Sequence, residues 1–414
     1  MSQPLAIAVP LRRHADFMRL WTGETISGFG SQVTQLALPL AAVLTLSAGP
    51  LEMGLLTAAG LAPYLVVALP AGAWIDRLRA RRRLMVLADL GRAALLASVP
   101  LAFAADALTI AQLYAVALAT GTLTVLFNTA FWTVLPGLVP EHQLADANGR
   151  LQTSAAAAQV AGPGIAGLLV QALSAPAAIV IDAVSFVLSA VAIGSMRAGD
   201  EATKPATVRR PLRAEVGEGL RFVAGNASLR AIVGSAATLN LFGVLILSIL
   251  ILYARRELHL APAAIGLIFA AGGVGALIGA LSAPWLSRTL GQGRSIFAAT
   301  VWFSVHLLVV PIASGPHAAE ILAANELLGG VAVMVFDVNG LTLAQLATPA
   351  EMLGRMAATM GFVTQGAKPL GALLGGVLGE LMGLHGALWV AGAGGTLTVL
   401  WTWFSPLRHR PPVV

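Results

Sequence analysis

Cysteine is absent from the 414-residue chain, and only 11% of its residues are charged. Without cysteine the chain has no disulfide framework, no iron–sulfur cluster and no thiolate zinc site. Soluble globular proteins carry about 25% charged residues, so the low charge excludes an ordinary soluble enzyme and a disordered protein. Lysine occurs only at positions 204 and 368. A chain this poor in charge also lacks the dense basic surface of a nucleic-acid-binding protein.

Apolar residues are abundant instead, at 57% of the chain, and the mean hydropathy is +0.83. A helix needs about 20 apolar residues to span a bilayer, so twelve helices would take about 240 residues, close to the apolar content found here. The apolar stretches predict an all-α membrane protein with twelve transmembrane helices. The predicted spans are 17–47, 51–75, 84–104, 109–135, 148–173, 176–197, 229–253, 262–284, 295–313, 318–346, 355–381 and 384–404.

Arginine and lysine are distributed unevenly among the segments that connect the predicted spans. If the N-terminus is cytoplasmic, 22 of the 25 basic residues lie on the cytoplasmic side, and the other three are Arg255, Arg256 and Lys368. Cytoplasmic loops of membrane proteins are enriched in Lys and Arg. We therefore expect a multi-pass protein of a bacterial cytoplasmic (inner) membrane with both termini in the cytoplasm.

The longest polar break, 198–228, divides the chain into nearly equal halves. We expect an N-terminal six-helix bundle over 1–197, a cytoplasmic linker over 198–228 and a C-terminal six-helix bundle over 229–414. Within the linker, Leu212, Val216, Leu220 and Val223 recur at helical spacing. This favours an amphipathic helix along the membrane surface, and a solvated linker is the alternative.

The two halves contain an internal repeat. Trp74-Ile75-Asp76-Arg77 follows the second span, and Trp285-Leu286-Ser287-Arg288 follows the eighth, 211 residues later. The Gly-Arg pair at 149–150, near the start of the fifth span, has a counterpart at 354–355, near the start of the eleventh. Two six-helix halves with a repeated loop are typical of transporters built from parallel repeats.

The loop after the second span resembles a signature of the major facilitator superfamily, in which a Gly precedes Asp-Arg and a basic cluster. The matching residues are Gly72, Asp76, Arg77, Arg81, Arg82 and Arg83. In the fifth span, Gly162-Pro163-Gly164-Ile165-Ala166-Gly167 is similar to the superfamily's antiporter signature, Gly-Pro-x-x-Gly-Gly. The resemblance implies two pseudo-symmetric six-helix bundles, with Gly72, Asp76, Arg77, Arg81 and Arg82 acting as a conformational latch.

More narrowly, the chain resembles the drug:proton antiporter branch that includes macrolide-efflux and siderophore exporters. The resemblance extends over nearly the whole chain and is carried by Phe17…Leu20-Trp21, Ala37-Leu38-Pro39, Asp89…Arg92, Asp182…Phe186, Glu218-Gly219-Leu220-Arg221 and Gly354-Arg355. It implies that spans one, four, seven and ten line a central cavity. It also implies that a proton gradient supplies the energy, with no bound cofactor.

Polar residues inside the predicted spans are the candidates for a substrate or proton pathway, because a charged side chain in a bilayer costs at least about 2.5–3.5 kcal/mol. Glu24, Gly28, Ser31 and Gln35 share one helical face in span one, as Glu326 and Asp337 do in span ten. The alternative for the small residues is close helix packing. The candidates are Glu24, Ser31, Gln35, Asn128, Asn240, Glu326, Asp337 and Lys368.

Lys368 lies about 13 residues, or roughly 20 Å, into its span at 1.5 Å per residue, at a depth comparable to that of Asp337. Three interpretations stay open: a titratable pair with Asp337, a counter-ion for an anionic substrate, or a structural ion pair. Asp89 and Arg92, three residues apart, are interpreted as local charge matching. The lone His306 is interpreted as a packing residue.

The sequence contains no Walker-type phosphate loop and no catalytic triad, and its histidines show no metal-ligand spacing. We therefore expect a transporter and not an enzyme: a proton-coupled exporter of amphipathic drugs or metabolites that works by alternating access. The alternatives are a dedicated siderophore or secondary-metabolite exporter and a lipid-handling membrane protein. The expected partners are a small-molecule substrate and membrane lipid, with no nucleic acid and no metal, and the expected state is a monomer.

Overall fold

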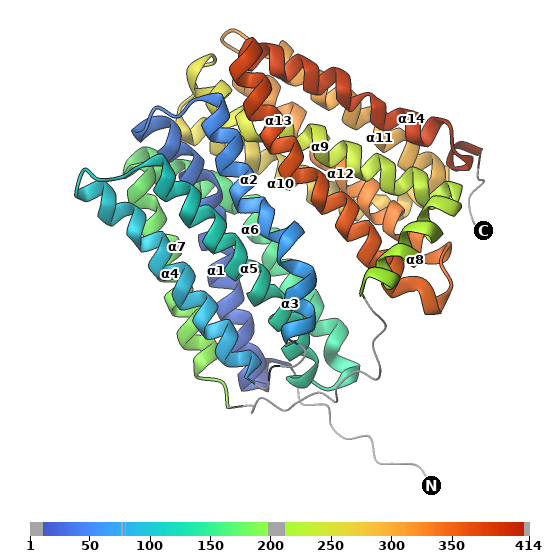
Figure 1. The fold of residues 1–414 in the computed structure, drawn as a ribbon, viewed down its shortest axis with the longest axis horizontal. Coiled ribbons are helices and arrows are strands. Elements are labelled where there is room, and N and C mark those ends of the chain that lie inside the picture. The colour runs from blue at the N-terminus through green and yellow to red at the C-terminus, as the bar shows by residue number, and fades with distance from the viewer. Residues whose placement is uncertain (1–10, 76–77, 79, 198–211, 410–414) are drawn as a thin grey trace.

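A computed structural model describes residues 11–75, 78, 80–197 and 212–409, and the regular elements in these ranges are all helices (Figure 1). The first half contains α1 (Ala15–Thr45), α2 (Pro50–Val66), α3 (Ala68–Ile75), α4 (Arg81–Ala104), α5 (Ile110–Val134), α6 (Leu144–Ala172) and α7 (Ala175–Gly194). The second half contains α8 (Leu212–Gly225), α9 (Ala227–Arg256), α10 (Pro262–Leu290), α11 (Gln292–Val309), α12 (Ala318–Leu346), α13 (Leu353–Gly395) and α14 (Leu397–Trp403). Short 3₁₀ turns flank several of them.

Local sequence explains where many of these helices begin. The side chains of Thr109 and Asn226 accept hydrogen bonds from backbone N–H groups in the first turns of α5 and α9, as N-cap residues do. Proline occupies the first position of α2 and of α10, where its missing N–H costs nothing. Because Pro50 and Pro262 hold equivalent places in the two halves, the internal repeat extends to the helix starts.

Two predicted spans differ from simple helices. The second span, predicted as 51–75, is broken at Val67 into α2 and α3, because the ring of Pro70 would clash with the carbonyl of Val66 in a continuous helix. Conversely, α13 contains two spans that meet at Gly383, whose φ of 78° and ψ of 163° are not helical. Glycine adopts this conformation without the penalty that a side chain would impose.

The prediction of twelve transmembrane helices in two bundles is confirmed. Nine helical stretches of the described residues are long and apolar enough to span a membrane by length and composition, and the stretch Leu353–Trp403 supplies two spans because of its break at Gly383. The remaining two spans are α1 and the broken α2–α3 pair. The last span therefore consists of the end of α13 and α14.

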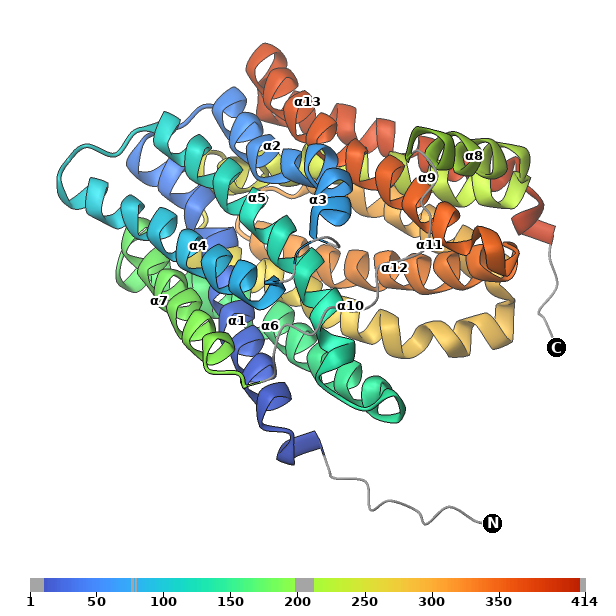
Figure 2. The same ribbon diagram turned by 60° about the horizontal axis from the view of Figure 1, so that its bottom comes forward.

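The two bundles lie side by side at one end of the molecule and diverge toward the other (Figures 1 and 2). We call the end that carries α8 and the links 135–143 and 347–352 the linker end. The opposite end, with the links 46–49, 105–109, 257–261 and 313–317, is the far end. The contact is made mainly by α2 against α13 and by α6 against α10, and α9 also touches α1 and α2.

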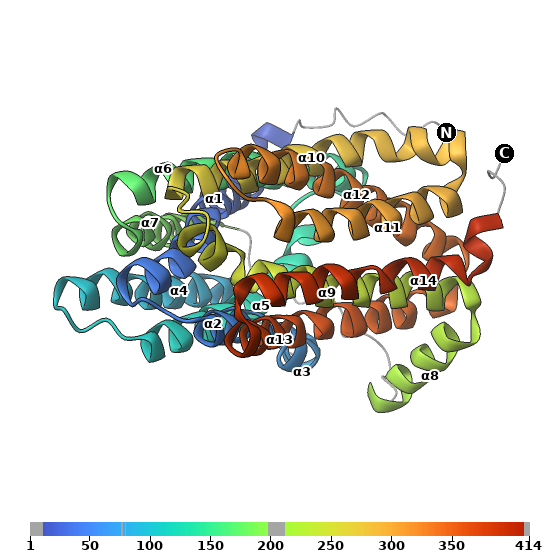
Figure 3. The same ribbon diagram turned by 90° about the horizontal axis from the view of Figure 1, so that it is seen from above.

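The linker helix α8 lies at the edge of the molecule, at the same end as the last residues of α14 (Figure 3). It packs against α13 through Gly219, where an added methyl group would lie 2.2 Å from Thr359 Oγ1, and through an ion pair of 2.9 Å between Glu218 and Arg355. Val223 is buried in this contact, whereas Leu220 is 42% exposed. The helix is thus present as predicted, but Leu220 does not share the packed face with Val223.

Candidate functional site

At the far end the helices of the two bundles approach to backbone contact at two places. A methyl group added at Gly54 of α2 would lie 2.6 Å from the Ala372 oxygen and 2.6 Å from the Gly376 Cα of α13. Real Cβ atoms do not approach other atoms so closely, because interiors are already packed to crystal-like density. Gly54 and Gly376 therefore let α2 and α13 approach to backbone contact.

A second contact of the same kind joins α6 to α10. A methyl group at Gly167 would lie 2.5 Å from the Pro262 oxygen, and one at Gly266 would lie 2.4 Å from the Pro163 oxygen. The antiporter-type motif, with Gly162, Pro163 and Gly167, thus lies where the bundles meet, and Gly162 itself packs on Gln32 of α1. We refer to the two contacts, Gly54–Gly376 and Gly167–Gly266, as the glycine seams.

Polar contacts at the far end reinforce the seams. Arg256, at the end of α9, donates hydrogen bonds to the backbone oxygens of Ser47 (2.8 Å) and Ala48 (2.9 Å) in the first bundle. Gln171 of α6 accepts a hydrogen bond of 3.3 Å from the backbone N–H of Ala263. Arg256 is one of the three basic residues that the charge distribution separates from the others, and here it bridges the bundles.

The predicted pathway residues lie in the middle portions of helices from both bundles. Gln35 of α1, Asn128 of α5 and Asp337 of α12 are exposed although they are polar and lie within spans. The other candidates are half-buried, namely Glu24, Ser31, Asn240, Glu326 and Lys368. They do not form one cluster: Glu24, Glu326 and the pair of Asp337 and Lys368 belong to three separate groups. The other four, Ser31, Gln35, Asn128 and Asn240, form no hydrogen bond or ion pair with these groups in the described residues.

The first group surrounds Arg92 in the N-terminal bundle. The guanidinium of Arg92 forms an ion pair with Asp89, and its carbon lies 4.5 Å from the ring centre of Phe127 and 4.1 Å from that of Phe186. Asp89 is fully buried, and Glu24 of α1 interacts electrostatically with both charges. Local charge matching is therefore present as predicted, but the guanidinium is also held between two aromatic faces, which favours a cation.

Asp182 extends this first group along α7. Its Oδ1 accepts a hydrogen bond of 3.0 Å from Ser185, and both side chains are buried against α1. A methyl group at Gly30 of α1 would lie 2.6 Å from Asp182 Oδ1, so α1 has room for the carboxylate only because residue 30 is glycine. The N-terminal bundle thus holds three carboxylates, those of Glu24, Asp89 and Asp182, near one arginine.

The second group is the predicted pair of Asp337 and Lys368. The two side chains interact electrostatically, which agrees with their predicted depths. They do not form a direct ion pair within 4.0 Å in the described part of the chain. The structure therefore brings this acid and base near each other without making them a closed salt bridge.

The third group joins α11 to α12 and was not predicted. His306 Nδ1 lies 3.0 Å from the backbone oxygen of Asn325, and Asn325 Nδ2 donates a hydrogen bond of 3.1 Å to the backbone oxygen of His306. His306 Nε2 lies 3.9 Å from Glu326 Oε1. The interpretation of His306 as a packing residue is incomplete, since one ring nitrogen is satisfied by backbone while the other faces a carboxylate. Its sequence signal was weak because the partners lie nineteen and twenty residues apart.

The predicted latch is described only in part. Asp76 and Arg77 lie outside the described residues. Arg81 is buried, and its Nε donates a hydrogen bond of 3.3 Å to the Ile75 oxygen at the end of α3, whereas Arg82 donates to the Met196 oxygen after α7. A methyl group at Gly72 would meet nothing within 4 Å. The basic cluster therefore anchors the start of α4 to neighbouring helix ends.

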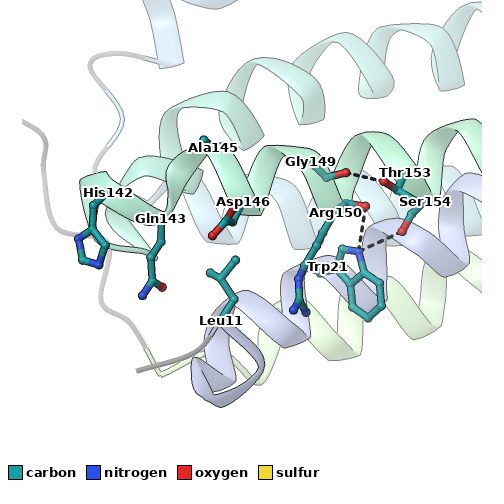
Figure 4. A pocket seen from close by; sticks show the side chains of 10 residues that line it. All are labelled: Leu11, Trp21, His142, Gln143, Ala145, Asp146, Gly149, Arg150, Thr153 and Ser154. Atoms are coloured by element: carbon teal, nitrogen blue, oxygen red, sulfur yellow. Dashed lines mark hydrogen bonds between the residues drawn. The ribbon is translucent and has the colours of Figure 1, made fainter. Parts of the chain in front are cut away.

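A pocket of about 800 Å³ opens at the linker end, between the starts of α1 and α6 (Figure 4). Trp21 forms one wall, and its indole N–H lies 3.0 Å from Ser154 Oγ and 3.4 Å from the Arg150 oxygen. Asp146, His142 and Arg150 give it a mixed charge. None of the predicted pathway residues lines this pocket. In the described residues, no group of three or more His, Asp or Glu side chains is arranged to hold a metal ion.

Comparisons with known proteins agree with this architecture. Residues 5–411 match the family model described as "Transmembrane secretion effector". The chain is 30% identical over 376 residues to the multidrug efflux pump Tap of Mycolicibacterium fortuitum, covering 87% of this chain and 88% of that protein. It is 26% identical over 384 residues to macrolide efflux protein A of Streptococcus pyogenes, covering 89% and 90%.

Among solved structures, a bacterial homologue of the iron transporter ferroportin, crystallised in its inward-facing state, superimposes with a TM-score of 0.78. The two chains are 18% identical, and the match covers 97% of this chain and all of the other. This likeness establishes the shared fold. Taken with the match over nearly its full length, it shows that the chain belongs to the transmembrane secretion effector family of major facilitator superfamily transporters.

Proposed function

We propose that this transporter is a proton-coupled exporter of amphipathic organic molecules that works by alternating access. The observation that carries the proposal is the asymmetry of the contact between the bundles. The glycine seams join the bundles at the far end, while the helices diverge toward the linker end (Figure 1). Two rigid bundles that touch at one end need only rock about the middle to touch at the other.

The distribution of basic residues supports an orientation with the linker end in the cytoplasm. With the linker end in the cytoplasm, 22 of the 25 Arg and Lys residues lie on the cytoplasmic side, in agreement with the enrichment of cytoplasmic loops in these residues. The described conformation is then closed toward the outside of a bacterial inner membrane and open toward the cytoplasm. An exporter loads its substrate in this conformation.

The substrate class rests on the relatives and on the composition of the mid-span surface. Two relatives that match over most of their length are named as multidrug and macrolide efflux proteins. Exposed mid-span groups such as Gln35 and Asn128 offer hydrogen bonds amid apolar helices, which suits ligands that are largely apolar with a few polar groups. We propose drugs and secondary metabolites of this kind as the substrates.

The proposal is tested with purified protein in liposomes that contain a pH-sensitive dye. Labelled erythromycin, a macrolide, should accumulate inside the liposomes when a proton gradient is imposed. The dye should show that protons leave the liposomes as erythromycin enters. Counterflow of labelled against unlabelled erythromycin at equal pH measures transport without the gradient. Erythromycin transport that is the same with and without the proton gradient would refute proton coupling. Transport of labelled phospholipid but not of erythromycin would indicate a lipid-handling protein.

Glu24 is the proposed proton carrier of the N-terminal bundle, because it is the carboxylate on the polar face of α1 and interacts with Asp89 and Arg92. Glu24→Gln keeps the shape of the side chain and removes its titration. We expect gradient-driven accumulation to be lost while counterflow at equal pH survives. Thr25→Ala is the matched control, because Thr25 lies next to Glu24 on α1 and its hydroxyl bonds the Trp21 oxygen of the same helix; it should retain the response to the gradient.

A dedicated exporter of an anionic metabolite is the second candidate, and Lys368 favours it. This lysine lies half-buried within α13 and forms no direct ion pair among the described residues, so its charge is available to an anionic ligand. Counterflow with a carboxylate-bearing siderophore tests the alternative. Saturable exchange of the siderophore, abolished by Lys368→Ala and not by Thr25→Ala, would support it over the drug exporter.

A further inference from the structure

The contact between His306 of α11 and Glu326 of α12 has a property that the proposed function does not use. His306 Nδ1 lies 3.0 Å from the Asn325 carbonyl oxygen. A backbone carbonyl only accepts hydrogen bonds, so Nδ1 must carry a hydrogen in every protonation state of this geometry. The remaining nitrogen, Nε2, is therefore the only position of the imidazole at which a proton can be gained or lost.

That nitrogen faces the carboxylate of Glu326, with Nε2 at 3.9 Å from Oε1. The side chain of His306 is 9% exposed and that of Glu326 is 19% exposed. When neither Nε2 nor the carboxylate holds a proton, the pair carries one negative charge in an apolar surrounding. When one proton is bound, the pair is neutral overall, either as imidazole with carboxylic acid or as imidazolium with carboxylate.

The surrounding helices provide no other charge to compensate this carboxylate. α10 packs against α12 here and presents Gly272, where an added methyl group would lie 3.3 Å from Glu326 Oε2. The single charged residue of α10, Arg288, lies sixteen positions further on. α11 presents Phe303 beside the imidazole. In the described part of the chain, His306 is the titratable side chain that acts electrostatically on Glu326.

Hydrogen bonds and close packing fix the orientation of the imidazole. Asn325 and His306 exchange hydrogen bonds through each other's backbone oxygens, which ties α11 to α12 at this level. A methyl group at Gly329 would lie 2.5 Å from His306 Nδ1, so the ring fits only because residue 329 is glycine. The geometry thus fixes which nitrogen titrates and where it points.

We propose that His306 and Glu326 form a proton-binding site of the C-terminal bundle, which takes up one proton between Nε2 and the carboxylate. The inference rests on the proposed function and adds a second proton site, in the C-terminal bundle, to Glu24 in the N-terminal bundle. Glu326 lies eight residues from the start of α12 at the far end, which is about 12 Å at 1.5 Å per residue. In the proposed orientation, the site exchanges protons with the outer side, where an antiporter takes them up.

Binding of the proton links charge to conformation. A buried pair with net negative charge is unfavourable in a bilayer, and adding a proton removes that net charge. The unprotonated site is therefore favoured when α10, α11 and α12 admit water, and the protonated site when they close around it. Because the proton binds more tightly to the closed conformation, its binding shifts the equilibrium between the two conformations of the bundle.

The test compares Glu326→Gln, His306→Gln and the double variant in the erythromycin liposome assay. We expect each single variant to lose gradient-driven accumulation by about tenfold, which corresponds to about 1.4 kcal/mol, while counterflow at equal pH is retained. Because the two groups share one proton, the double variant should be no worse than either single variant. Ser304→Ala, on α11, is the control and should behave as wild type.

Three results would overturn the inference: a wild-type response to the gradient in Glu326→Gln, the same response in His306→Gln, or losses that multiply in the double variant. If His306→Gln also loses counterflow, the variant Gly329→Ala is measured in its place. The added methyl group displaces the imidazole while both titrating groups remain, so the pH midpoint of transport must move, and an unmoved midpoint overturns the pair. Wild-type protein without any gradient response refutes proton coupling itself, which separates the failure of the proposed function from the failure of this site.

Discussion

At the scale of single residues, the buried charges of the N-terminal bundle depend on one arginine. Arg92 is 5% exposed, forms an ion pair with Asp89 and lies between the rings of Phe127 and Phe186. Arginine suits this position because its guanidinium is planar and more weakly hydrated than an ammonium group. The same flat group satisfies a carboxylate at its edge and two aromatic rings at its faces.

We expect Asp89→Asn to destabilise the protein strongly, because it leaves Arg92 buried without its counter-charge. Removing one partner of a buried pair costs about 3–5 kcal/mol in soluble proteins. The measurement is the apparent unfolding temperature of the purified protein in detergent. The double variant Asp89→Asn/Arg92→Gln should be less destabilised than Asp89→Asn alone. With Arg92→Gln measured alone, losses of stability that simply add in the double variant would mean that Asp89 and Arg92 do not interact.

Asp337 and Lys368 present the opposite arrangement, in which a predicted pair is near but not closed. If their attraction is structural, Asp337→Ala and Lys368→Ala should each reduce stability or transport, and exchanging the two residues should restore most of it. If Lys368 instead binds an anionic substrate, the exchanged variant should be stable and inactive. A double-mutant cycle measured on counterflow distinguishes these results, and additive losses would show that the two residues do not interact.

At the scale of helices, the glycine seams decide how closely the bundles approach. We expect Gly54→Ala to push α2 away from α13, because its methyl group would lie 2.6 Å from the Ala372 oxygen. The far end should then open more often, and accumulation of erythromycin should fall. Gly60→Ala is the matched control, since it lies on the same helix and its methyl group would meet nothing within 4 Å.

The opening of the far end is measured as the distance between two spin labels, one on each bundle. Because the chain contains no cysteine, a label attaches only where cysteine is introduced. Glu257 after α9 and Ala105 after α4 are suitable positions at the far end. A longer distance in Gly54→Ala than in Gly60→Ala is the expected result. Identical distance distributions in the two variants would show that the seam does not control closure.

At the scale of the whole molecule, the orientation of the two ends determines whether the described state loads or releases substrate. We expect a cysteine introduced at Ala224 in α8 to be protected from an impermeant maleimide in intact cells. A cysteine introduced at Glu257 should react with it, because the far end faces outward in the proposed topology. Both positions are exposed. Labelling of Ala224→Cys but not of Glu257→Cys would invert the topology and make the described state outward-open.

Twelve spans, their approximate ends and the division into halves could be predicted from the sequence. The reason is that membrane helices must be apolar and about 20 residues long, and their loops carry the basic charge. The span predicted as 318–346 coincides with α12. The break between α2 and α3 was foreseeable from Pro70, whereas the non-helical Gly383 inside α13 agrees with the predicted boundary between the last two spans.

Local hydropathy and short motifs were enough to predict the class of protein, its fold and the set of polar residues inside the spans. Which of those residues meet depends on how the helices pack. Arg92 reaches Phe186 across 94 positions, and His306 reaches Glu326 across 20, so neither contact leaves a periodic pattern. Helix packing brings such positions together through glycines whose role is visible only when the neighbouring backbone is in place. The glycine seams and the His306–Glu326 site are therefore properties of the packed bundles and not of any one helix.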